Sequence, residues 1–168
     1  MMKYLIIAML ICFASYKSLA DKNYPEILTD NKDNFVNSLS YCIDWIYYDL
    51  PKEQHIPKEL VIAQAALETG WGKSRFANEG NNLFGIRTYE KEGEWLLPIP
   101  WTKWPGWGVK KYESRCESVM DYVRIINELW AYEELRKVRD NNGDVYEMAD
   151  KLENYAKNPN YTVLVKAI

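Results

Sequence analysis

The chain has 168 residues, with 21 basic side chains, 24 acidic side chains and a single histidine, for a formal net charge of −3. This length allows one domain with a hydrophobic core and is too short for two domains of usual size. The acidic balance excludes nucleic acid as an expected partner, because phosphates require a basic face. His55 has no cysteine or histidine neighbour at ligand spacing, so we predict no metal site and no cofactor.

Residues 1–20 have the pattern of an export signal. Lys3 precedes the apolar run Tyr4–Ala14, and Ser18-Leu19-Ala20 is typical of a cleavage site. The apolar run is too short to span a bilayer. We expect cleavage after Ala20 and a mature domain over residues 21–168, which lacks two lysines and has a net charge of −5. The predicted product is periplasmic or secreted and cell-wall associated, monomeric and not inserted in a membrane; an uncleaved anchor is the alternative.

The first predicted helix covers Asp30–Leu50, where apolar residues recur at helical spacing. Asp30 or Asp33 can cap it, and Pro51 follows as a stop. It contains Cys42, one of two cysteines in the predicted mature chain; the other is Cys116. In an oxidising compartment the two could form a disulfide, and two buried free thiols fit the same pattern.

The second predicted helix covers Pro57–Thr69. Pro57 suits a first helical turn, and Gly70 and Gly72 provide the stop. The residues from Leu60 to Leu67 are all apolar except Gln64, which is typical of a buried helix.

Glu68 lies one turn after Gln64, on the same helix face. The negative end of the helix dipole and the apolar surroundings both disfavour its charged form, which raises its pKa. A carboxyl group with a raised pKa suits proton donation near neutral pH. The alternative is an ordinary helix-end carboxylate, either solvated or paired with Lys73 or Arg75.

The middle of the chain predicts a small antiparallel β lobe. A short helix over Lys73–Glu79, with Ser74 as its cap, leads to a turn at residues 80–82. Leu83–Tyr89 alternates as a strand, in which Gly85 indicates a bulge or a close backbone approach. After a charged turn, Trp95–Gly108 holds four tryptophans and three prolines and predicts an extended loop. Val109–Glu113 is then a strand that pairs with the first.

The rest of the chain is predicted to be helical. Ser114 and Glu117 form the pattern of a capping box for a helix to about Ala131. Further helices are predicted over Tyr132–Asp140, over residues 144–155 and over residues 161–168. The sequence therefore predicts a single α+β domain, mainly α with a small β lobe.

Five ordered blocks of the sequence resemble a known family. They are Ala65–Gly72, Asn82–Ile86, Tyr112–Ser114 with Glu117–Tyr122, Tyr132 with Leu135-Arg136, and Tyr155–Tyr161. In order and spacing this pattern resembles family 73 of the glycoside hydrolases, the bacterial endo-β-N-acetylglucosaminidases. The stretch from Leu97 to Gly108 is most similar to the Bax-type branch of exported proteins.

The resemblance implies a lysozyme-like fold with a groove between the two lobes. It also implies hydrolysis of the β-1,4 bond after N-acetylglucosamine in the glycan strands of peptidoglycan, with Glu68 as the general acid. The family has a second glutamate on the β lobe, for which Glu94 is our choice among residues 90, 92, 94 and 113 because it borders the Trp-rich loop. A solvated charged turn is the alternative, and the acetamido group of the substrate could replace a second carboxylate.

The resemblance also suggests roles for other side chains. Tyr161 would lie near the acid and stabilise developing charge or orient the acetamido group; a buried core tyrosine is the alternative. The predicted substrate-binding residues are Gln64, Asn82, Phe84, Trp104, Trp107 and Tyr122. For Gln64 the alternative is to satisfy a buried backbone group, for Asn82 to shape its turn, and for Phe84 and Tyr122 to pack in the core. At least one of Trp101, Trp104 and Trp107 is expected to stack on a sugar, with closure of the lobe as the alternative.

Two other functions fit the same sequence. A lytic transglycosylase shares the lysozyme-like fold, works with a single carboxylic acid and leaves an anhydro sugar. A glycan-binding module without turnover would keep the groove and lack the second catalytic group.

Overall fold

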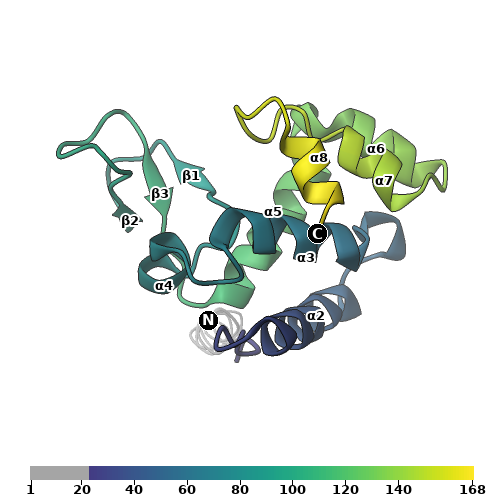
Figure 1. Cartoon of the computed structure of the whole chain (residues 1–168), viewed down its shortest axis with the longest axis horizontal. Helices are drawn as coiled ribbons and strands as arrows, with labels where there is room; N and C mark the ends of the chain where they lie inside the picture. The colour runs from purple at the N-terminus through teal and green to yellow at the C-terminus, as the bar shows by residue number, and fades with distance from the viewer. Residues whose placement is uncertain (1–22) are drawn as a thin grey trace, which may run out of the picture.

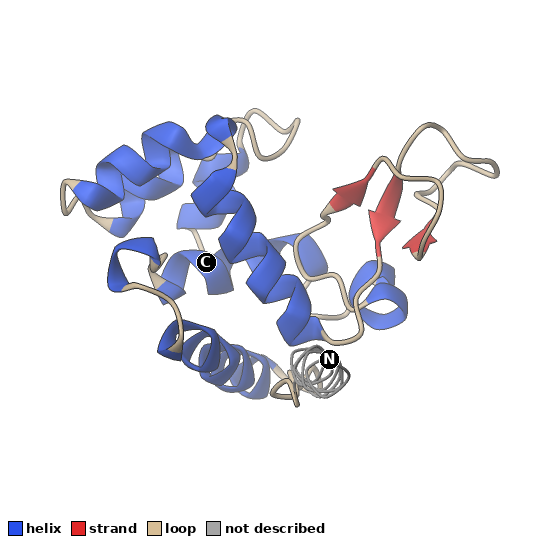
Figure 2. Cartoon of the chain, turned by 180° about the vertical axis from the view of Figure 1, so that it is seen from behind, coloured by secondary structure: helices blue, strands red, loops and turns tan. Residues whose placement is uncertain are grey.

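The computed structural model describes residues 23–168, and the predicted export signal lies outside this range. The domain is mainly helical with one small sheet, as the sequence predicted (Figures 1 and 2). The elements in chain order are α2 (Lys32–Tyr48), η1 (Lys52–Gln54), α3 (Lys58–Thr69), α4 (Arg75–Gly80), β1 (Arg87–Thr88), β2 (Trp95–Leu96), β3 (Gly108–Lys110), α5 (Arg115–Glu128), η2 (Trp130–Tyr132), α6 (Glu133–Asp140), α7 (Val145–Asp150) and α8 (Tyr161–Lys166).

Helix α3 is the central element of the helical part. It packs against α2, α7 and α8, and Figure 1 shows it crossing the middle of the molecule between α2 and α8. This position explains its composition, because a helix covered on several sides must be apolar almost all round. Its buried residues are Leu60, Val61, Ala63, Gln64, Ala65, Ala66 and Thr69.

Several helix ends differ from the prediction. Asn31 caps α2 in place of the predicted aspartates, and its Oδ1 accepts from the Asn34 backbone N–H at 2.8 Å. Helix α5 ends at Glu128, because Leu129 has an extended backbone with φ −74° and ψ 137°. Helix α7 ends at Asp150, and the chain reaches Tyr155 through turns instead of the predicted longer helix.

The β lobe contains the strand β2, which the sequence analysis does not predict. β3 lies between β1 and β2 and pairs antiparallel with both, with Arg87 opposite Val109 and Leu96 opposite the same residue. The predicted pairing of the first and last strands is confirmed. The prediction of an extended loop from residue 95 is wrong for its first two residues, which form β2. Trp95 and Leu96 precede Pro98, so their backbone groups can still form the hydrogen bonds of a strand.

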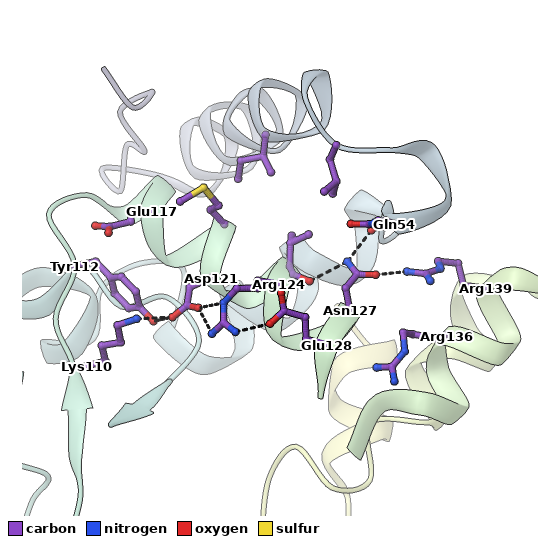
Figure 3. A pocket seen from close by; sticks show the side chains of 14 residues that line it. Gln54, Lys110, Tyr112, Glu117, Asp121, Arg124, Asn127, Glu128, Arg136 and Arg139 are labelled. Atoms are coloured by element: carbon purple, nitrogen blue, oxygen red, sulfur yellow. Dashed lines mark hydrogen bonds and ion pairs between the residues drawn. The ribbon is translucent and has the colours of Figure 1, made fainter. Parts of the chain in front are cut away.

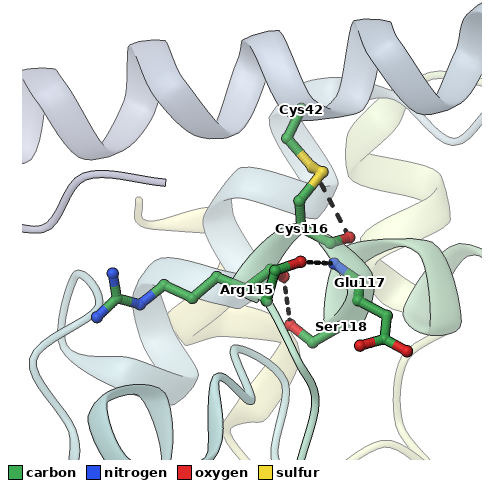
Figure 4. The surroundings of a disulfide bond; sticks show 6 residues. Cys42, Arg115, Cys116, Glu117 and Ser118 are labelled. Atoms are coloured by element: carbon green, nitrogen blue, oxygen red, sulfur yellow. Dashed lines mark hydrogen bonds between the residues drawn. A yellow bond between two sulfur atoms is a disulfide. The ribbon is translucent and has the colours of Figure 1, made fainter. Parts of the chain in front are cut away.

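A disulfide joins α2 to the start of α5. Cys42 and Cys116 are both buried, and their Cα atoms are 5.8 Å apart (Figure 4). This excludes the alternative of two free thiols in this structure. Within residues 23–168, no helix has the length and apolar character needed to cross a membrane.

Asp121 on α5 connects the β lobe to the helices. Its carboxylate accepts from the Lys110 ammonium and the Tyr112 hydroxyl, both at 2.7 Å, and from the Arg124 guanidinium (Figure 3). The Asp121 side chain is only 10% exposed, whereas the side chains of Lys110 and Arg124 are 41% and 51% exposed. Burial alone would raise the pKa of Asp121, but the hydrogen bonds from Lys110, Tyr112 and Arg124 outweigh it and hold the pKa below its ordinary value.

Candidate active site

The turn after α3 sets the position of Glu68. Gly70, Trp71 and Gly72 all have positive φ, at 58°, 64° and 79°. The Thr69 hydroxyl accepts from the Gly72 N–H at 2.7 Å and donates to the Ala65 carbonyl at 2.5 Å, which ties the turn to the helix. The helix therefore ends abruptly, and Glu68 stands in its last turn, half-buried.

Glu68 has the electrostatic character predicted for it. Burial raises the pKa of its carboxyl group above the ordinary value, and a hydrogen bond from the Tyr161 hydroxyl opposes part of that rise. Burial also raises the pKa of the Tyr161 phenol, with a further contribution from the negative charge of Glu68. Tyr161 therefore stays protonated and acts as a donor, while Glu68 is able to hold a proton at higher pH than an exposed glutamate.

Gln64 and Tyr122 continue this hydrogen-bond chain into the core. The Gln64 amide Nε2 donates to the Tyr161 hydroxyl at 2.9 Å, and the Tyr122 hydroxyl donates to Gln64 Oε1. Both Gln64 and Tyr122 have 0% exposed surface. Direct contact of either side chain with a ligand would require it to be uncovered first.

The loop over residues 82–86 passes directly beside Glu68. Asn82 Oδ1 accepts from the N–H groups of Phe84 and Ile86, and its Nδ2 donates to the carbonyls of Ile86 and Lys110. Asn82 is fully buried and shapes this loop. A Cβ built on Gly85, whose φ is +65°, would lie 3.6 Å from Glu68 Oε2. The close backbone approach expected at Gly85 is therefore found, and it is an approach to the candidate acid.

Aromatic rings surround this arrangement. Phe84 is stacked on Tyr122 with ring centroids 4.2 Å apart, and Tyr155 is stacked on Tyr161 at 5.4 Å. The Tyr155 hydroxyl donates to the Phe84 carbonyl at 2.8 Å. Tyr155 thus links the 82–86 loop to α8. Sequence analysis had assigned it no role, although it lies in one of the blocks that carried the resemblance.

No hydrogen bond or ion pair joins the predicted residues of the β lobe to Glu68. The Glu94 side chain is 78% exposed and pairs with Lys111 at 3.1 Å. Trp104 is half-buried against Trp95, with ring centroids 4.5 Å apart, and the Arg87 guanidinium lies 4.0 Å from the centre of the Trp107 ring. Trp101 is 53% exposed and presents more of its ring than the other two.

A pocket of about 610 Å³ lies elsewhere, along α5 between α2, β3 and α6 (Figure 3). Its lining includes Asp121, Arg124 and Arg136 and does not include Glu68. In the described part of the chain, no group of three or more histidine, cysteine, aspartate or glutamate side chains is arranged to hold a metal ion.

The structure therefore brings together Glu68, Gln64, Tyr161, Tyr122, Phe84 and Asn82 from the predicted set. It leaves Glu94, Trp104 and Trp107 on the β lobe. Gly85 and Tyr155 are additions to the site. The glycine in a strand-like run was the available signal for Gly85.

Comparison with known proteins identifies the family of this chain. Residues 45–168 match the family described as mannosyl-glycoprotein endo-beta-N-acetylglucosaminidase. Peptidoglycan hydrolase FlgJ of Escherichia coli K12 is 31% identical over 120 residues, covering 62% of this chain and 36% of FlgJ. Protein bax of the same strain is 37% identical over 86 residues, covering 50% of this chain and 28% of protein bax. Exo-glucosaminidase LytG of Bacillus subtilis is 28% identical over 148 residues, covering 83% of this chain and 51% of LytG.

The match spans between 28% and 51% of the length of these relatives. In fold, it resembles the catalytic domain of the autolysin Auto from Listeria monocytogenes, with a TM-score of 0.59 and 21% identity, over 96% of this chain and 91% of that domain. The family match extends over most of the chain and includes every residue of the Glu68 site. The chain belongs to the mannosyl-glycoprotein endo-beta-N-acetylglucosaminidase family, that is, to family 73 of the glycoside hydrolases.

Proposed function

We propose that this chain is an exported peptidoglycan hydrolase that cleaves the β-1,4 bond after N-acetylglucosamine, with Glu68 as its general acid. The observation that carries the proposal is the half-buried Glu68 carboxyl group, with its raised pKa, held between Tyr161 and the Gly85 backbone in a member of a glucosaminidase family. The glycan would lie between the helical part and the β lobe.

In the proposed mechanism, the protonated Glu68 donates its proton to the leaving glycosidic oxygen. A raised pKa keeps the proton available near neutral pH, and general acids of this kind contribute on the order of 10²–10⁴ in rate. Glu68 becomes negatively charged in this step. The Tyr161 hydroxyl donates to it and stabilises that charge as it forms.

The second group is proposed to come from the β lobe, with Glu94 as the candidate. Its exposed side chain, paired only with Lys111, is accessible to a bound glycan. A comparison of Glu94→Gln with Glu92→Gln would test this choice, since both alter one carboxylate of the same turn. A large loss of activity in Glu94→Gln alone supports the choice. Equal activity in both would favour the substrate's acetamido group as the second group.

The proposed site of action is outside the cytoplasm. A buried disulfide persists in oxidising compartments, and Cys42 and Cys116 form one here. The substrate proposed from the family, peptidoglycan, is located there as well. Half-buried and exposed indole rings on the β lobe, with Trp101 the most exposed of its loop, would provide stacking surfaces for sugar rings.

The decisive experiment compares wild type with Glu68→Gln on purified peptidoglycan. Glu59→Gln is the matched control, because it changes an exposed glutamate at the other end of the same helix. We expect loss of at least about 10²-fold in rate for Glu68→Gln and none for Glu59→Gln. Full activity of Glu68→Gln would refute the assignment of the acid.

Mass spectrometry of the products tests the reaction itself. Reducing-end N-acetylglucosamine is expected, whereas 1,6-anhydro-muramic ends would identify a lytic transglycosylase. Binding of glycan without product release, unchanged by Glu68→Gln, would identify a binding module.

A further inference from the structure

Three buried polar side chains, one from each of three helices, are linked by hydrogen bonds in a line that leads to Glu68. Tyr122 on α5 donates to Gln64 on α3, and Gln64 donates to Tyr161 on α8. The Tyr161 hydroxyl lies close enough to the Glu68 carboxyl group to lower its pKa. The exposed fraction is 0% for Tyr122 and Gln64 and 4% for Tyr161. Water therefore has little access to these groups, and each must find its hydrogen-bond partners within the chain.

The direction of each hydrogen bond in this series follows from the chemistry of Tyr122, the first donor. A phenol carries a single proton, and the Tyr122 hydroxyl donates it to Gln64 Oε1. The carboxamide oxygen must then face Tyr122, which turns the carboxamide nitrogen toward Tyr161. The Tyr161 oxygen thus accepts a hydrogen bond from Gln64, and its own proton is left for the Glu68 carboxylate.

We propose that Tyr122 and Gln64 are positioning residues that fix the direction of the Tyr161 proton toward the Glu68 carboxyl group. Neither would touch the glycan. If the Gln64 amide were reversed, its oxygen would face Tyr161, and the Tyr161 proton would have two competing acceptors. This inference rests on the proposed function only in calling Glu68 the acid, since the effect on its protonation is a property of the free protein.

The test measures the pKa of Glu68 by NMR on protein labelled with ¹³C at the glutamate side-chain carboxyl groups. Its signal is assigned by its absence from Glu68→Gln. We expect Tyr161→Phe to raise the pKa of Glu68 by about one unit, because a hydrogen bond to the ionised carboxylate is lost. Tyr122→Phe and Gln64→Met should each raise it by about half a unit, because the Tyr161 proton is then free to turn away.

Two controls separate positioning from a general structural effect. Tyr132→Phe removes another phenol from the same aromatic cluster and should leave the pKa of Glu68 unchanged. In a Tyr161→Phe background, Tyr122→Phe and Gln64→Met should have no further effect, since they act through Tyr161. Shifts that persist in that background, or no shift in the single variants, would overturn the proposal.

A measurement on the unmodified protein covers the case in which a core substitution prevents folding. Nuclear Overhauser effects should connect the Gln64 amide protons to the Tyr161 ring. Contacts from those protons to the Tyr122 ring hydrogens instead would show the reversed amide and refute the inference.

If activity is also measured, the alkaline limb of kcat/KM should move to higher pH in Tyr122→Phe. A protein that hydrolyses no peptidoglycan yet shows these pKa shifts would refute the proposed function and leave the positioning chain intact.

Discussion

The Gly85 backbone lies against the carboxyl group of Glu68, so that a Cβ at position 85 would stand 3.6 Å from Oε2. This close approach brings the loop over residues 82–86 beside the acid. It depends on glycine, because φ at position 85 is +65°. The predicted acid and the predicted backbone approach, which lie 17 positions apart in the sequence, are thus parts of one site.

We predict that Gly85→Ala lowers stability by about 1 kcal/mol, since alanine in the left-handed region is strained by that amount. The added methyl group would also make van der Waals contact with Glu68 Oε2, so activity on peptidoglycan should fall further than stability explains. Urea denaturation and hydrolysis rates would be measured together. Gly93→Ala is the control, with φ +109° and nothing within 4 Å of its added Cβ. Equal activity losses in the two variants would contradict a role for the Gly85 contact.

The raised pKa of Glu68 makes its effect on stability depend on pH. In the folded state Glu68 keeps its proton at pH values where it is already ionised in the unfolded chain. Its contribution to stability therefore falls as pH rises from the ordinary glutamate pKa to the raised one. Glu68→Gln should consequently be more stable than wild type at pH 8, and less so or not at all at pH 4. Thermal unfolding at both values checks this, and a gain that is larger at pH 4 would show the opposite sign.

Asp121 gives the opposite pH dependence. Its pKa is lowered in the folded state, so its stabilising effect is present above the ordinary aspartate pKa and is lost as pH falls through the lowered value. Asp121→Asn should lower the free energy of unfolding by about 2 kcal/mol at pH 7, because Lys110 and Arg124 lose their shared carboxylate. The difference should shrink as pH falls below the ordinary aspartate pKa and through the lowered value. Glu128→Gln, which removes an exposed partner of Arg124 alone, should have little effect.

The disulfide between α2 and α5 should stabilise the domain strongly. It closes a loop between positions 74 residues apart, for which the chain-entropy relation gives about 4 kcal/mol. Replacing Cys42 and Cys116 together with serine should lower the urea midpoint accordingly. Reduction of wild type with dithiothreitol should reproduce the loss, and a reduced protein with an unchanged midpoint would argue against it.

The tryptophans of the 95–108 segment should separate into binding and packing roles. Trp101 is 53% exposed, so Trp101→Ala should raise KM for peptidoglycan several-fold and leave the unfolding midpoint nearly unchanged. Trp104 packs on Trp95 and beside Gly108, so Trp104→Ala should lower the midpoint. Rates over a range of substrate concentrations, together with thermal unfolding, would distinguish the two. An unchanged KM in Trp101→Ala would remove it from the proposed glycan contacts.

The sequence by itself determined the features that depend on neighbouring residues. Helix α3 covers Lys58–Thr69, one residue shorter at its start than predicted, with Pro57 before it and Gly70 after it. Proline and glycine restrict or free the backbone at their own positions, so they mark these ends in the sequence. The end of that helix also placed a glutamate where its charge is disfavoured. Similarly, Ser74 and Ser114 cap α4 and α5 through hydrogen bonds that span three residues.

Only the tertiary structure decided which distant groups meet. Gln64 forms hydrogen bonds with Tyr122 and Tyr161, which lie 58 and 97 positions away in the sequence. The local pattern left open whether its partner would be the substrate or a backbone group. The same holds for the pairing of the two cysteines and for the cluster around Asp121. The local sequence indicates whether a polar side chain will be buried. Its hydrogen bonds can then be made by any complementary group that the fold brings near. The raised pKa of Glu68 therefore depends on burial by distant segments, and Tyr161 on α8, far away in the sequence, opposes part of the rise.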